Sequence, residues 1–219
     1  MSIAVAHMAG GSCEVHRHQG TGGARASTAL IPLIQELLAQ AGLRLADLDA
    51  IVFGRGPGSF TGLRTACSVA QGLAFGAAVP VLPVDTLLAV AEEARDGAGA
   101  TQVVALLDAR MEEVYTAAYA FEAGLWQQRS AIRLVPPDAV QVPTGWLAAG
   151  NAFARYGDRL PSGAPLEALP TATALLRLAP ALIAAGHCVA AGQAIPLYIR
   201  DKVAQTTEER AVLRSAAKP

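Results

Sequence analysis

Apolar residues recur along the chain with two different periods, and each period predicts a kind of element. Spacing of three and four predicts helices over about residues 27–41, 61–76, 85–94 and 171–186. Short apolar runs and strict alternation predict strands over residues 2–6, 12–18, 49–54, 79–84, 102–109, 113–121, 130–135 and 146–150. Because strands and helices alternate in both halves, we expect an α/β fold.

The best boundary between the halves is the loop "DGAGA" at residues 96–100. Strands start afresh after it, which predicts two similar α/β subdomains, residues 1–98 and 99–204. A polar, alanine-rich tail is expected over residues 205–219. Pro32 is expected in the first turn of its helix, where proline is tolerated, and Pro180 is expected to kink or divide the last one.

Composition narrows the classes of function. The chain has 219 residues, of which 53% are hydrophobic and 16% charged, and this hydrophobic content is enough for a sizeable core. No apolar run reaches the ~18 residues of a membrane span. We therefore expect a cytoplasmic protein. The net charge of −1, with both signs mixed, argues against holding RNA or DNA alone but not against a role within a complex. Cys13, Cys67 and Cys188 are too far apart for a CxxC metal pair.

The most distinctive stretch is "FGRGPGSFTGLR" at residues 53–64. It lacks the lysine of a P-loop, and Ser59 and Thr61 stand where a dinucleotide fingerprint needs glycine. Two interpretations stay open: a tight structural corner between a strand and a helix, or a backbone that faces a ligand. The residues of this glycine corner are Gly54, Gly56, Pro57, Gly58, Ser59, Thr61 and Gly62.

The helix predicted after the corner carries small residues over much of its circumference, so that another helix can approach it closely. Its neighbour is either another part of this chain or a partner protein, and the pattern alone does not separate the two.

No catalytic or metal site is expected. His16 and His18 alternate on a strand, no HxxxH pair exists, and both rings are expected to be exposed. The charged run with Asp108, Arg110 and Glu112 lies between two predicted strands. A solvated hairpin turn explains it better than a catalytic cluster.

The stretch "GRGPGSFTGLRTACSVAQGLAFG" resembles the signature of the TsaB (YeaZ) family. Weaker matches are "LIPLIQELLAQAGL" at residues 30–43, "LLDARMEEVY" at 106–115 and "PLYIRDKVA" at 196–204. Together they cover residues 2–204 in the family's order. The resemblance implies two subdomains of the actin/hexokinase/Hsp70-like ATPase (ASKHA) fold, a degenerate copy of the enzyme TsaD.

The resemblance also implies a function. TsaD transfers threonylcarbamoyl from threonylcarbamoyl-adenylate to the adenosine beside the anticodon of tRNA. A TsaB protein is a non-catalytic partner and activator of TsaD, with the ATPase TsaE as third partner. It would meet tRNA only through the complex and bind no cofactor alone, with ATP or ADP at or near the interface.

In the family, the first two helices form the dimer contact, which maps here onto about residues 27–41 and 61–75. The expected interface residues are Leu30, Leu33, Ile34, Leu37, Leu63, Ala66, Ala70 and Leu73. A homodimer through the same helices is an alternative. Two further alternatives are an ATP-binding enzyme of the same superfold, phosphotransferase or peptidase-like, and a self-associating module.

One departure from the family concerns its first strand, which carries an Asp-Thr-Ser-like turn and is central in the first sheet. That strand has no counterpart here, because Ser2–Ala6 matches the strand that follows it. We therefore expect the natural chain to start upstream of residue 1. The alternative is that residues 3–6 are the first strand, with His7 in place of the aspartate.

Overall fold

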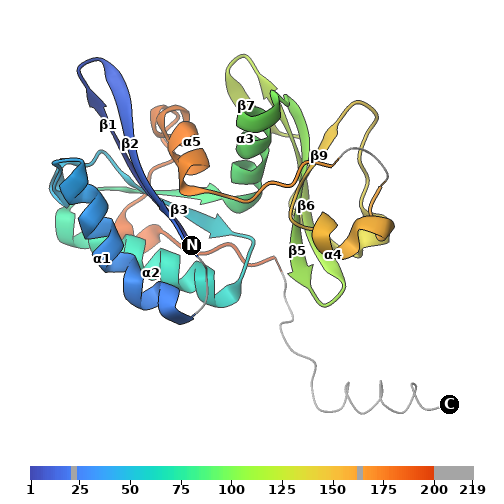
Figure 1. Cartoon of the computed structure of the whole chain (residues 1–219), viewed down its shortest axis with the longest axis horizontal. Helices are drawn as coiled ribbons and strands as arrows, with labels where there is room; N and C mark the ends of the chain where they lie inside the picture. Colours follow the sequence, from blue (N-terminus) through green and yellow to red (C-terminus); the bar gives the residue numbers. More distant parts are fainter. Residues whose placement is uncertain (21–23, 162–164, 200–219) are drawn as a thin grey trace, which may run out of the picture.

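The computed structural model describes residues 1–20, 24–161 and 165–199 (Figure 1). The tail expected over residues 205–219 lies outside the described residues. Within the described part, no helix is long and apolar enough to cross a membrane.

The first half contains two separate pairs of strands. β1 (Ser2–Ala9) and β2 (Ser12–Gln19) form an antiparallel hairpin. β3 (Ile51–Gly56) and β4 (Val81–Asp85) are parallel, as expected for strands joined by a crossover helix. That helix is α2 (Phe60–Ala77).

Helices cover both faces of these strands. α1 (Ala24–Gln40) packs through Leu37 and Leu38 on Ile3 and Val5 of β1. α2 packs on Phe53 and Val81 of the parallel pair. The opposite face is covered by α5 (Ala172–Ala184), which contacts β1, β3 and β4. In Figure 1, α1 and α2 lie on one side of the strands and α5 lies on the other.

The second half is built on one mixed sheet in the order β7-β6-β5-β9, with β8 also paired to β6. β5 (Gln102–Arg110) is buried on both faces: one meets α3 (Thr86–Ala98), and the other meets the cluster of Val140 and Tyr156. The remaining elements are β6 (Glu113–Glu122), β7 (Leu125–Gln128), β8 (Arg133–Val135), β9 (Leu147–Gly150) and α4 (Phe153–Tyr156).

The structure corrects the prediction for Pro32 and half of the prediction for Pro180. α1 starts at Ala24, so Pro32 lies in the interior of the helix rather than in its first turn. α5 continues through Pro180 and is not divided there, and a kink at this proline stays a prediction. The apolar faces of these helices are packed against strands, and this packing outweighs the local cost of proline.

Candidate partner interface

The glycine corner joins the end of β3 to the start of α2. The amide of Gly56 donates a hydrogen bond to Thr86 Oγ1 (3.1 Å), and the carbonyl of Arg55 accepts one from the amide of Leu197 (2.7 Å). Arg55 also pairs with Asp85 at 2.6 Å. Ser59 is the N-cap residue of α2, but its side chain makes no capping hydrogen bond. The corner is thus held by α3 and by the segment around Leu197.

Gly56 is the position of the corner that admits no side chain. Its φ is +124°, and a Cβ there would lie 2.6 Å from the carbonyl oxygen of Leu197. We expect Gly56→Ala to lower the free energy of unfolding by about 2–4 kcal/mol, because strain and a clash with backbone add together. The measurement is urea denaturation.

Gly58→Ala is the matched control for that substitution. A Cβ at Gly58 would meet only Leu63, at an ordinary 3.8 Å. We expect a change within about 1 kcal/mol. Equal losses for the two variants would contradict the assignment of Gly56 as the constrained position.

The structure divides the expected interface residues into two groups. Leu37, Leu63 and Ala70 are 4%, 8% and 3% exposed, and they lie in the core of the chain itself. For these three residues the prediction of a partner contact is corrected, since a side chain already packed against its own fold cannot also cover a partner. The other five are partly buried: Leu30, Leu33, Ile34, Ala66 and Leu73. A partner contact through those five stays a prediction.

The exposed side of α2 is different in character. It presents Ser68, Gly72, Phe75 and Gly76, which we call the outer face of α2. Phe75 is 84% exposed, and a Cβ added at Gly72 or Gly76 would meet nothing within 4 Å in the described residues. A small-residue surface around one exposed aromatic ring can be approached closely by another helix.

The charged run between β5 and β6 forms the predicted hairpin turn. Asp108 accepts hydrogen bonds from the amide of Arg110 (2.8 Å) and from Tyr156 Oη (3.0 Å). Burial, and next the bond to Asp108, raise the pKa of Tyr156. Glu112 pairs with Arg159. Both carboxylates are therefore engaged by donors from their own fold and are not presented together as an acid–base pair.

The histidines differ from expectation. His16 and His18 lie on a strand as predicted, but both are half-buried rather than exposed. The rings of His7 and His16 are 6.1 Å apart. Among the described residues there is no group of three or more His, Cys, Asp or Glu that could hold a metal ion.

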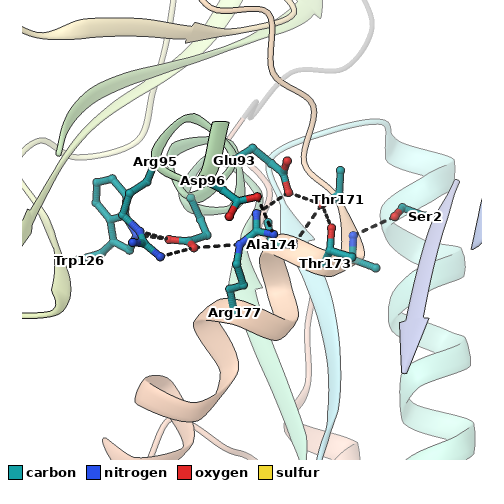
Figure 2. A network of polar contacts seen from close by, with 11 residues as sticks. Ser2, Glu93, Arg95, Asp96, Trp126, Thr171, Thr173, Ala174 and Arg177 are labelled. Carbon is teal, nitrogen blue, oxygen red and sulfur yellow. Dashed lines mark hydrogen bonds and ion pairs between the residues drawn. The ribbon is translucent and has the colours of Figure 1, made fainter. Parts of the chain in front are cut away.

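A polar network connects α3, α5 and β7 (Figure 2). At its centre is Glu92, which is 1% exposed and accepts hydrogen bonds from Arg95 (2.8 and 2.9 Å), Trp126 Nε1 (2.8 Å) and Arg177 (3.0 Å). Arg177 reaches on to Glu93 at 2.8 Å. Burial works to raise the pKa of Glu92, but these donors together lower it. Since the carboxylate is ionised and fully bonded, the network is structural rather than an acid–base site.

The family model described as "TsaD: tRNA N6-adenosine threonylcarbamoyltransferase" matches residues 18–131. The tRNA threonylcarbamoyladenosine biosynthesis protein TsaB of Escherichia coli is 39% identical, with 80% of each chain covered. The TsaB protein of Haemophilus influenzae is 38% identical, covering 80% of this chain and 79% of the relative. The chain belongs to the TsaB family.

Solved structures of the TsaB family agree with this assignment. YeaZ from Pseudomonas aeruginosa superposes with a TM-score of 0.81 at 39% identity, covering 90% of this chain and 94% of that one. This likeness, together with the TsaD family model, confirms the predicted ASKHA-like α/β fold.

Sequence reasoning missed the outer face of α2 and the network around Glu92. The small residues of this helix predict a close neighbour, but their spacing does not show which side of the helix stays exposed. A signal for the network did exist: Glu92 lies within the apolar pattern of "DTLLAVAEEA". Its partners Trp126 and Arg177, however, are 34 and 85 residues away along the chain.

Proposed function

We propose that this chain is a non-catalytic partner and activator of TsaD in the formation of threonylcarbamoyladenosine next to the tRNA anticodon. The observation that carries the proposal is the identity of 39% over 188 residues to a protein named for threonylcarbamoyladenosine biosynthesis. The match of a TsaD family model to residues 18–131 supports a partner that shares the fold of the enzyme.

In this proposal TsaD packs against α1 and the outer face of α2. Phe75 supplies an exposed aromatic anchor, and aromatic anchors dominate the energetics of many interfaces. Gly72 and Gly76 let the partner backbone come near. Ile31 of α1 is a second exposed apolar side chain on these helices, at 44%. TsaE joins the complex, and tRNA is held by the assembly rather than by this chain.

Co-purification with TsaD tests the interface. We expect Phe75→Arg to weaken the complex at least tenfold. In the complex the partner would bury the ring of Phe75, and replacing that ring with a charge should cost ~2 kcal/mol or more of binding free energy. Leu125→Arg on β7 is the matched control: it also places arginine at an exposed apolar position, and it should bind normally. Equal co-purification of wild type and Phe75→Arg would reject this interface.

The rival functions predict different results for the isolated chain. One related structure is described as similar to the peptidase YeaZ, and an enzyme of that superfold would turn over substrate alone. We expect no nucleotide binding by calorimetry without TsaD, with ATP or ADP held at or near the interface in the complex.

A homodimer through the same helices would be lost with Phe75→Arg, and TsaD should compete with it. The complex is expected in the cytoplasm.

A further inference from the structure

The first turns of α2 carry a cluster of three exposed side chains from two distant segments of the chain. The guanidinium of Arg64 lies over the ring of Phe60, 3.8 Å from its centroid, and Arg64 Nε donates a hydrogen bond to Tyr198 Oη (3.1 Å). The two aromatic rings are 5.7 Å apart. We call these three residues the Arg64 cluster. Phe60 is 43% exposed and Tyr198 is 47% exposed.

Hydrogen bonds hold the segment that contains Tyr198 in place beside α2. The carbonyl of Ala194 accepts a hydrogen bond from Gln71 Nε2 (2.8 Å), and the amide of Leu197 donates one to a carbonyl of β3 (2.7 Å). Tyr198 follows directly, so its ring is positioned next to Arg64. Because the stacked and hydrogen-bonded guanidinium is already restricted, it loses less conformational entropy when a partner binds it.

The guanidinium of Arg64 lacks an acidic partner of its own. Arg55, Arg95 and Arg177 each pair with a carboxylate. Nη1 and Nη2 of Arg64, however, make no hydrogen bond or ion pair with residues 1–20, 24–161 or 165–199. With Nε occupied, these two groups present parallel N–H donors at the end of a planar fork, and this arrangement matches the two oxygens of a carboxylate.

The Arg64 cluster continues the outer face of α2. Phe60, Arg64, Ser68, Gly72 and Gly76 follow one another at intervals of four residues, so they lie along one side of the helix. Arg64 is separated from Gly72 by ~12 Å along the helix axis. A partner that packs on the outer face therefore reaches the cluster. Arginine and aromatic side chains are also the types that most often dominate binding energy.

We propose that the Arg64 cluster binds an aspartate or glutamate side chain of TsaD that is flanked by apolar residues. The carboxylate accepts hydrogen bonds from Nη1 and Nη2 of Arg64, and its apolar neighbours cover the exposed rings of Phe60 and Tyr198. This inference rests on the proposed function, because it takes TsaD as the partner that covers α2.

Two other anions fit the cluster less well. A tRNA phosphate is held best where several cations gather, whereas the cluster has one arginine beside two aromatic rings. The chain's own Glu208 and Glu209 are flanked by Thr207 and Arg210 rather than by apolar residues. A carboxylate of a partner protein therefore matches both the charge and the apolar surroundings of Arg64.

The dissociation constant of the complex with TsaD tests this inference when it is measured by calorimetry at low and high salt. Arg64→Met keeps an unbranched side chain without the charge, and we expect it to weaken the complex about tenfold or more at low salt. The wild-type complex should weaken as salt rises, because ions screen the pair, and the Arg64→Met complex should weaken much less. Arg64→Lys keeps the charge without the planar fork and should lie between them.

Arg133→Met is the matched control. Arg133 is an exposed residue of β8 in the second half of the chain, and its replacement changes the net charge by the same amount. We expect its affinity for TsaD to stay within about twofold of wild type. Equal weakening by both variants would overturn the proposal, and so would an unchanged affinity or an unchanged salt dependence for Arg64→Met.

The results also separate this inference from the proposed function. If Phe75→Arg weakens the complex and Arg64→Met does not, TsaD covers the outer face and only the carboxylate site is rejected. If the wild-type chain forms no complex with TsaD, both are rejected. Tighter binding of TsaD after joint replacement of Glu208→Gln and Glu209→Gln would show that the chain's own carboxylates occupy the cluster, which would also overturn the proposal.

Discussion

Replacing Ala70 with arginine should unfold the isolated chain rather than only detach a partner. Ala70 is 3% exposed in a cluster with Phe53, Cys67, Ala74 and Val81. A guanidinium there is overpacked and buried without a partner, which we expect to cost about 4 kcal/mol or more. That loss approaches the whole stability of an ordinary domain, ~5–15 kcal/mol. The measurement is the urea midpoint of the purified variant.

Phe75→Arg is the control on the same helix. Phe75 is 84% exposed, so its replacement should shift the free energy of unfolding by no more than about 0.5 kcal/mol. An unchanged midpoint for Ala70→Arg would show that Ala70 lies outside the core and would return it to the partner surface.

Glu92→Gln should produce the second large loss of stability. The substitution keeps the size of the side chain but leaves Arg95 and Arg177 without the carboxylate that now pairs with both. Breaking a buried pair by removing one partner costs about 3–5 kcal/mol. Glu122→Gln is the control, because Glu122 and Arg129 form an exposed pair whose loss should cost less than about 1 kcal/mol.

The contribution of Glu92 to the free energy of unfolding should also depend on pH. The pKa of Glu92 is lowered in the folded chain, so the folded state favours the ionised form more than the unfolded state does. Its contribution is complete above the ordinary glutamate pKa and is lost as the pH falls through the lowered value. The difference in stability between wild type and Glu92→Gln should therefore shrink on acidification. A difference that stays constant from neutral to acid pH would contradict an ionised Glu92.

The sequence was sufficient for the long elements because the two periods are strong in this chain, whereas β7 and α4, of four residues each, were not predicted. The apolar run of residues 113–121 and the helical spacing of residues 27–41 each correspond to an observed element. The sequence did not predict which surface covers the apolar stripe of a helix. A stripe such as Leu33, Leu37 and Ala41 shows which side of a helix is buried, but not whether the chain or a partner buries it.

Reconstituted transfer of threonylcarbamoyl to tRNA tests the central proposal most directly. Labelled threonylcarbamoyl-adenylate and tRNA are incubated with TsaD, with this chain, and with both, and incorporation of label into tRNA is measured. We expect no transfer by this chain alone and at least a tenfold increase over TsaD alone when both are present. Transfer by this chain without TsaD, or no increase when it is added, would contradict its role as a non-catalytic activator.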